Sequence, residues 1–261
     1  MDLGLKGATA AVAGASRGLG FAVALELARE GASVAICSRD EAVVKDAAAR
    51  IIKETDSGAH AIVADVATAS GAQTFIEDAT SALGGLQVLV TNAGGPPAGR
   101  SIDFDDDAWM SAFELNCLSA VRMVRAALSH IQAQPWGRVL MVTSTAPKQP
   151  VANLALSNAV RAATHGFAKS LSQELAGTNI TVNCLMPGQI LTDRLRSLVG
   201  APENAGPDHP AFAEMARLIP AGRIGTTDEF AAVAAFLCSE RASFVNGVSL
   251  QVDGGYLKGL F

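Results

Sequence analysis

Short apolar runs alternate with helical patterns along almost the whole chain, and this alternation restricts the fold more than any other feature. The runs that we expect to form strands are residues 8–13, 33–37, 61–64, 88–90, 139–142, 180–185 and 248–252. The helical patterns lie at about residues 21–30, 40–55, 69–82, 105–133, 152–176 and 227–238. Strands connected through helices lie parallel, with helices on both faces of the sheet. The alternation therefore predicts an α/β fold, a doubly wound, Rossmann-like parallel sheet of about seven strands.

The length and composition suit one large domain. The chain has 261 residues, 49% of them apolar, and we expect residues 1–261 to form a single domain. A net charge of −5, with 17% charged residues, argues against binding to nucleic acid or to an anionic membrane. No apolar run reaches the roughly 18 residues of a membrane span, so we expect neither a span nor a signal peptide.

The cysteines indicate a reducing environment. Cys37, Cys117, Cys184 and Cys238 are widely spaced in apolar surroundings, with no C-x-x-C pair and no clustered histidines. Such a pattern is typical of a cytoplasmic protein with free thiols and no metal site.

A glycine-rich turn follows the first expected strand and leads directly into a helical pattern. Its sequence is Gly14-Ala-Ser-Arg-Gly18-Leu-Gly20. Glycines let the backbone turn tightly and let a phosphate approach the helix N-terminus, where free N–H groups attract an anion. The spacing differs from the commoner G-x-G-x-x-G, so the turn by itself also suits a simple helix entry.

The end of the second expected strand carries Ser38 and Arg39, about twenty residues beyond the glycine turn. In dinucleotide-binding folds an acid at this point binds the free 2′-hydroxyl of the adenosine ribose, whereas a basic residue accommodates a 2′-phosphate. Arg39, together with Arg17 in the glycine turn, favours NADP(H) over NAD(H). The alternative is that both arginines are solvated surface residues.

Polar residues follow three further strands. Asp65-Val66 and Asn92-Ala93-Gly94 come directly after expected strands, and the buried run at 139–142 ends in Thr143, Ser144 and Thr145. Ligands bind at the carboxyl ends of parallel strands, so these segments are candidates for one site.

These landmarks make the chain similar to the short-chain dehydrogenase/reductase family, of the type that includes 3-oxoacyl-carrier-protein reductases. The matching motifs extend over about residues 3–255 and are Gly14-x-x-x-Gly18-x-Gly20, Asp65-Val66, Asn92-Ala-Gly, Asn116, Ser144, Pro187-Gly188-x-x-x-Thr192 and Val252-Asp-Gly-Gly255.

The resemblance implies a role for each motif. Asp65 would contact the adenine, Asn92 and its glycines the adenosine side, and Thr192 the nicotinamide carboxamide. Asn116 would interrupt the helix at 105–133 and hold a water in a proton relay, unless it makes an interhelical hydrogen bond instead. The implied cofactor-binding residues are Gly14, Ser16, Arg17, Gly18, Leu19, Gly20, Ser38, Arg39, Asp65, Val66, Asn92, Ala93, Gly94, Arg161, Pro187, Gly188, Ile190 and Thr192.

The segment at 189–222 is rich in proline and has broken helical patterns, which suits a mobile lid. In the resembling family the equivalent segment closes over the substrate. The family's long helices, matching residues 105–133 and 152–176, pair across subunits, so a homodimer or homotetramer is implied.

The match breaks at the catalytic helix, where the family requires a tyrosine followed four residues later by a lysine. Aligning Gly166-Phe-Ala-Lys-Ser-Leu171 with the usual continuation of that helix puts Ser157 and Arg161 at those two positions. Ser157 lies 13 residues after Ser144, the separation common in the family, and the only tyrosine is Tyr256. Taken alone, a serine and an arginine one turn apart also suit a structural or solvated role.

Two interpretations follow. In the first, the protein is an NADP-dependent oxidoreductase with Ser144, Ser157, Arg161 and Asn116 as its catalytic residues, and Arg161 suits an anionic substrate. In the second, it is a catalytically silent NADP(H)-binding member that acts as a sensor or as a partner subunit. Lys148, His165 and Tyr256 are weaker candidates for the missing proton donor.

Overall fold

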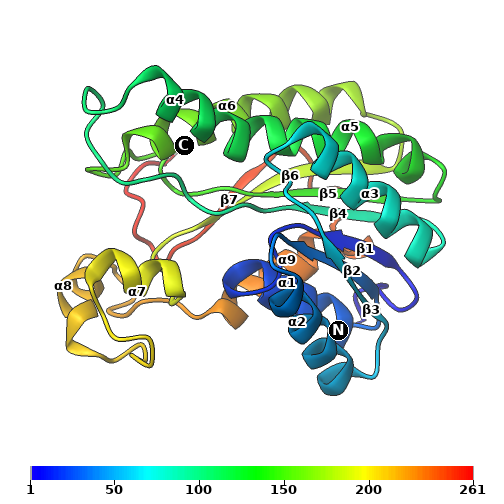
Figure 1. Ribbon diagram of the computed structural model, residues 1–261, viewed down its shortest axis with the longest axis horizontal. Coiled ribbons are helices and arrows are strands. Elements are labelled where there is room, and N and C mark those ends of the chain that lie inside the picture. The colour runs from blue at the N-terminus through cyan, green and yellow to red at the C-terminus, as the bar shows by residue number, and fades with distance from the viewer. Residues whose placement is uncertain (1, 261) are drawn as a thin grey trace.

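A single parallel sheet forms the centre of the molecule, as the alternating pattern predicts (Figure 1). The computed structural model describes residues 2–260. Within that range seven strands are paired in the order β3-β2-β1-β4-β5-β6-β7, and every pair is parallel. The strands are β1 Thr9–Val12, β2 Ser33–Ser38, β3 Ala59–Val63, β4 Val88–Thr91, β5 Gly137–Val142, β6 Ile180–Pro187 and β7 Ser249–Val252.

Helices connect the strands and cover both faces of the sheet (Figure 1). They are α1 Gly18–Arg29, α2 Glu41–Thr55, α3 Ala69–Leu83, α4 Asp106–Phe113, α5 Ser119–Gln132, α6 Ala155–Glu174, α7 Asp193–Val199, α8 Ala213–Arg217 and α9 Thr227–Leu237. The helical pattern expected at 105–133 forms two helices, because a π-helical turn at Glu114–Leu118 separates α4 from α5, and Asn116, which the resemblance implied would interrupt this helix, lies in that turn. Such turns insert one extra residue per turn and often occur at functional sites.

Alternating strand residues divide the core into two halves. Ala10 and Val12 of β1 face one way and pack with α1, α2 and α9, whereas Ala11 faces the other way and packs with α3 and α5. A strand that is apolar on both faces can be buried only between two helical layers. All four cysteines are buried and unpaired within these layers.

The order of the strands places the candidate site. The chain moves outward from β1 through β2 to β3, then returns to β4 on the other side of β1. The connections that leave β1 and β4 therefore diverge to opposite faces of the sheet and open a crevice at the carboxyl ends of these strands. The glycine turn after β1 and Asn92 after β4 both lie at this crevice.

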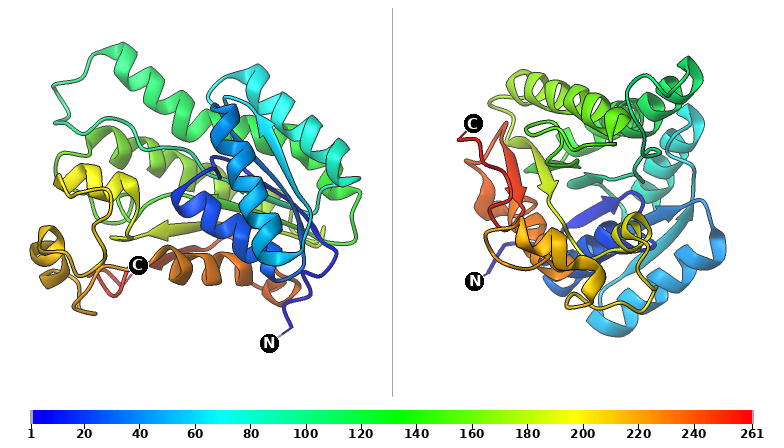
Figure 2. Two further views of the ribbon diagram at one scale, coloured as in Figure 1. Left: turned by 60° about the horizontal axis from the view of Figure 1, so that its bottom comes forward. Right: turned by 90° about the vertical axis from the view of Figure 1, so that its left-hand side faces the viewer.

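Residues 189–222 form a small folded unit with an apolar core of its own, at one end of the sheet (Figure 2). Leu195 of α7, Phe212 and Ile219 are buried in it, and Ile224 and Tyr256, from outside the segment, pack with them. No helix within residues 2–260 is long and apolar enough to cross a membrane.

Candidate active site

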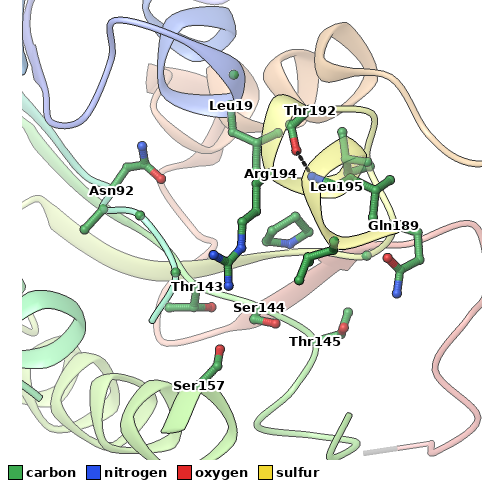
Figure 3. A pocket seen from close by; sticks show the side chains of 18 of the residues that line it. Leu19, Asn92, Thr143, Ser144, Thr145, Ser157, Gln189, Thr192, Arg194 and Leu195 are labelled. Carbon is green, nitrogen blue, oxygen red and sulfur yellow. Dashed lines mark hydrogen bonds between the residues drawn. The ribbon is translucent and has the colours of Figure 1, made fainter. Parts of the chain in front are cut away.

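A cavity of about 420 Å³ opens at the carboxyl ends of the central strands, against α7 (Figure 3). It unites most of the residues that the sequence singles out. Those that line it are Gly14, Arg17, Gly18, Leu19, Asn92, Ala93, Gly94, Ser144, Ser157, Arg161, Pro187, Gly188, Ile190 and Thr192. Ser16, Arg17, Ser38 and Arg39 line a second, more open hollow next to it.

Asn92 fastens the glycine turn to the end of β4. Its side-chain Nδ2 donates to the backbone oxygens of Ala13 and Gly14, at 3.3 and 3.0 Å. Gly14 has a φ of +56°, a conformation that side chains rarely tolerate, and a Cβ on it would lie 2.9 Å from the Asn92 oxygen. The conformation of the glycine turn after β1 therefore also depends on Asn92, which follows β4.

The N-terminus of α1 has no side-chain cap. Asp40, Thr68, Asp105, Thr192 and Thr226 cap α2, α3, α4, α7 and α9, but no side chain accepts a hydrogen bond at the start of α1. Its first turn also holds no acid. The helix thus presents free N–H groups and the positive end of its dipole to the cavity, which fits a diphosphate group.

Two exposed arginines border the second hollow. Arg17 lies within the glycine turn, and Arg39 comes directly after β2. Neither arginine makes an ion pair within residues 2–260. The neighbouring acid, Asp40, is engaged elsewhere, because its carboxylate accepts a 3.1 Å hydrogen bond from the Val43 amide as the cap of α2. The hollow therefore suits a phosphate better than a ribose hydroxyl that needs a carboxylate acceptor.

Ser144, Ser157 and Arg161 meet in the inner part of the cavity. Ser144 follows β5, and Ser157 and Arg161 share one face of α6. Figure 3 shows the Ser144 and Ser157 side chains directed toward the same space. The Ser144 hydroxyl accepts a 3.1 Å hydrogen bond from the Ala146 amide, which leaves its proton free to donate.

Arg161 is a buried cation without an acidic partner among the described residues. Its Nη1 donates to the backbone oxygen of Val142 at 3.3 Å. Burial, and then the charge of Arg194, lower the pKa of Arg161 from 12.5 to about 10. The guanidinium therefore remains charged at neutral pH, and it supplies charge rather than a mobile proton.

Asn116 lies in the π turn and is buried, but it does not line the cavity. Its Nδ2 donates to the backbone oxygen of Gly94 at 2.8 Å, and its Oδ1 has no partner. The backbone oxygen of Asn116 accepts a 2.9 Å hydrogen bond from the Thr164 hydroxyl of α6. Thr164 uses one of the two lone pairs of that carbonyl and Oδ1 is unpartnered, so the water expected at Asn116 stays a prediction, and the Nδ2 contact supports the Gly94 loop.

Three other expected cofactor residues lie outside the cavity lining, namely Gly20, Asp65 and Val66. The carboxylate of Asp65 accepts a 3.1 Å hydrogen bond from the Ala67 amide and shapes the turn before α3. Gly20 acts through packing, since a Cβ there would lie 2.7 Å from the Asn92 side chain.

The three weaker proton-donor candidates, His165, Tyr256 and Lys148, do not line the cavity. His165 bridges β5 and β7, with Nε2 2.8 Å from the Thr143 hydroxyl and Nδ1 3.2 Å from the Ser249 hydroxyl. Tyr256 packs against the apolar core of the 189–222 segment, and Lys148 is exposed outside the cavity lining.

His165 should make the protein sensitive to acid. Burial, and then the charges of Lys148 and Arg161, lower its pKa from 6.5 to about 4. The unfolded chain binds a proton below the ordinary value while the folded chain does not, so stability falls as the pH drops from 6.5 to about 4. The loss is about 3 kcal/mol at most. Urea unfolding of wild type and His165→Gln at several pH values measures it, and equal pH dependence in both would contradict this role.

Arg194, in the first turn of α7, lines the cavity and was not among the residues that the sequence singled out. It crosses the cavity (Figure 3), and its Nη2 donates to the backbone oxygen of Pro96 at 2.7 Å. A basic residue in the first turn of a helix is unfavourable, because its charge opposes the helix dipole. This unusual position of Arg194 was the one feature of the sequence that could have drawn attention to it.

Known proteins resemble this chain over its whole length. The family model described as Enoyl-(Acyl carrier protein) reductase matches residues 14–257. The 3-oxoacyl-[acyl-carrier-protein] reductase FabG of Pseudomonas aeruginosa is 32% identical over 253 residues, which is 97% of this chain and 98% of the relative.

Two solved structures have the same fold. L-sorbose reductase from Gluconobacter frateurii, complexed with NADPH and L-sorbose, superimposes with a TM-score of 0.93 at 32% identity, over 100% of both chains. A short chain oxidoreductase from Pseudomonas aeruginosa PAO1, described as containing an atypical catalytic center, has a TM-score of 0.90 at 29% identity. The match covers 98% of this chain and 99% of that one.

Proposed function

This chain belongs to the short-chain dehydrogenase/reductase family, and on that premise we propose that it is an NADP(H)-dependent oxidoreductase acting on a carbonyl or alcohol substrate through a non-standard active site. The observation that carries the proposal is the single cavity shared by the glycine turn and by Ser144, Ser157 and Arg161. A cofactor-binding surface and a set of polar donors thus face one enclosed space.

The residues present fit NADP(H). The uncapped N-terminus of α1 and Gly18 would hold the diphosphate, and Arg17 and Arg39 the 2′-phosphate. Pro187, Gly188 and Thr192 would bind the nicotinamide end, as the family resemblance implies. When bound, the reduced nicotinamide supplies a hydride.

The remaining chemistry belongs to side chains of this protein. Ser144 and Ser157 donate hydrogen bonds to the substrate oxygen, and the buried charge of Arg161 stabilises the alkoxide that develops there. Water supplies the proton, because a serine hydroxyl is a much weaker acid than a tyrosine and arginine does not release its proton. Lack of a positioned general acid costs about 10²–10⁴ in rate, so we expect a slow enzyme.

The alternative is a catalytically silent NADP(H)-binding protein that acts as a sensor or partner subunit. One observation favours it: among the described residues that line the cavity there is no tyrosine, lysine or histidine, so no side chain there matches the family's proton donor. In this alternative the protein still binds NADP(H), but no group delivers a proton to a substrate.

One experiment separates the two functions. Purified protein is mixed with NADPH and a panel of ketones, aldehydes and 3-oxoacyl thioesters, and loss of the reduced cofactor is followed by absorbance. Saturable turnover of any compound supports the oxidoreductase. Saturable NADPH binding without turnover supports the silent protein, and absence of NADPH binding contradicts both.

Cofactor choice should depend on Arg39. We expect Arg39→Asp to weaken NADPH binding by about 10²-fold, because it removes a charge-assisted contact to the 2′-phosphate and adds a repelling carboxylate. NADH binding should stay unchanged or tighten, since a carboxylate at this position can accept a hydrogen bond from the free 2′-hydroxyl and the rest of the pocket is unchanged. Fluorescence titration with both cofactors measures the ratio. An unchanged preference for NADPH would show that Arg39 is merely a solvated surface residue.

The assembly and the lid are further parts of the proposal. We infer that residues 189–222 close over the substrate as a lid within the single domain 1–261. We infer self-association as a homodimer or homotetramer from the family resemblance, in which the helices equivalent to α4–α5 and α6 pair across subunits. Analytical ultracentrifugation tests the assembly, and a monomer at micromolar concentration would exclude it.

A further inference from the structure

The cavity carries an excess of positive charge that the cofactor site explains only in part. Three arginines line it, Arg17, Arg161 and Arg194, against one acid, Asp193. That acid is already engaged, because its carboxylate forms a 2.9 Å ion pair with Arg196 and its side chain is 67% exposed. Among the described residues, the inner cavity therefore offers cations without counterions.

Arg194 reaches over the inner cavity from the lid. Its guanidinium lies on Gly95, since a Cβ on that glycine would be 3.1 Å from Nη2. Its described hydrogen bond goes to the Pro96 backbone oxygen, a neutral acceptor. Figure 3 shows the side chain extending from α7 toward Thr143 and Ser144. A guanidinium has five N–H groups in a planar fork, so several remain to grip a ligand.

Arg161 lines the same cavity. It is buried, and its described hydrogen bond also goes to a backbone oxygen, that of Val142. The charge of Arg194 contributes to the lowered pKa of Arg161, so the two cations repel each other across the cavity. A bound anion would remove this repulsion and satisfy both guanidinium groups.

We propose that Arg194 and Arg161 recognise the carboxylate of an oxo acid, whose ketone oxygen is held by Ser144 and Ser157. This inference rests on the proposed function and names its substrate class. A carboxylate matches the planar fork of arginine with two parallel hydrogen bonds. Because Arg194 belongs to α7, the same contact would draw the 189–222 lid onto the substrate.

The diphosphate of the cofactor is the other group that could occupy Arg194, and the test distinguishes the two. The protein is saturated with NADP⁺, so that no reduction occurs, and binding of pyruvate, acetoacetate and levulinate is measured by calorimetry against their methyl esters. The variant Arg194→Met keeps the length of the side chain and removes the charge. Arg217→Met, in α8 of the same lid and outside the cavity lining, is the matched control.

We expect at least one acid to bind wild type and Arg217→Met about tenfold or more tightly than its ester, and Arg194→Met to lose that preference. NADPH binding should change by less than about threefold. Absence of any preference for an acid in all three pairs would overturn the proposal. So would a variant that weakens NADPH binding and keeps the preference, since Arg194 would then serve the diphosphate. Binding is measured without turnover, so a silent protein leaves this result valid.

Discussion

Replacing Ser157 with tyrosine and Arg161 with lysine together should raise carbonyl reduction by about 10²–10⁴-fold, the usual contribution of a positioned general acid. A phenol is far more acidic than a serine hydroxyl, and a lysine beside it lowers its pKa further. Ser157 lines the cavity, so an added ring can enter open space rather than the core. Steady-state NADPH oxidation with ethyl acetoacetate and a 3-oxoacyl thioester measures the gain.

The control for this variant is Ser157→Phe with Arg161→Lys, which adds the same ring without the hydroxyl. It should bind NADPH as tightly as the tyrosine variant and be no faster than wild type, since it also lacks the Ser157 hydroxyl. If the tyrosine variant binds NADPH but is no faster than the phenylalanine variant, then residues 157 and 161 are not the catalytic positions. The result also bears on the silent interpretation, because restored turnover would show that only the proton donor is missing.

Gly20→Ala should destabilise the protein by about 3 kcal/mol or more and weaken NADPH binding by at least about 10²-fold. A Cβ at residue 20 would collide with the backbone oxygen of Gly14 and lie 2.7 Å from the Asn92 side chain. The collision is with backbone, which cannot rotate away. The glycine turn would have to open, and the α1 N-terminus would lose its position beside the cavity. Urea unfolding and fluorescence titration with NADPH measure the two effects.

Gly166→Ala provides the matched comparison. Gly166 lies in α6, and a Cβ there would meet nothing within 4 Å. Alanine should stabilise this helix by about 0.5–1 kcal/mol, since it restricts the unfolded chain. Equal effects of the two substitutions would mean that the glycine turn is not packed as described.

With Ser157 and Arg161 at the catalytic positions and Arg194 also lining the cavity, we propose that the site orients its substrate and stabilises developing negative charge through fixed positive charge. Ser144 and Ser157 can donate hydrogen bonds, and Arg161 and Arg194 hold fixed positive charge around the same space. A hydride acceptor that carries its own carboxylate would be oriented without a tyrosine. Orientation and charge compensate in part for a weak acid, which is why we favour a slow enzyme over an inert one.

The fold was predictable from local patterns. Apolar runs such as Val139–Val142 can be buried only in a two-sided parallel sheet, and amphipathic segments between them must cross over its faces. The same logic brought the glycine turn, Asn92, Ser144 and Thr192 to one edge of the sheet, because the carboxyl ends of parallel strands coincide. The helical pattern alone did not reveal the π turn at Glu114–Leu118, since its sequence is as helical as its flanks, and only the family resemblance indicated an interruption at Asn116.

By itself the sequence determined the layered fold and the edge of the sheet at which the candidate residues gather, and it predicts the replacement of the catalytic pair, because each depends on residue type and on spacing within one strand or helix. Only the tertiary structure decided where individual side chains act. Thr164 meets the Asn116 carbonyl across 48 residues, and Arg194 meets Pro96 across 98. Contacts over such separations depend on how independently formed helices pack and on which rotamers the packing allows, and no local pattern encodes either.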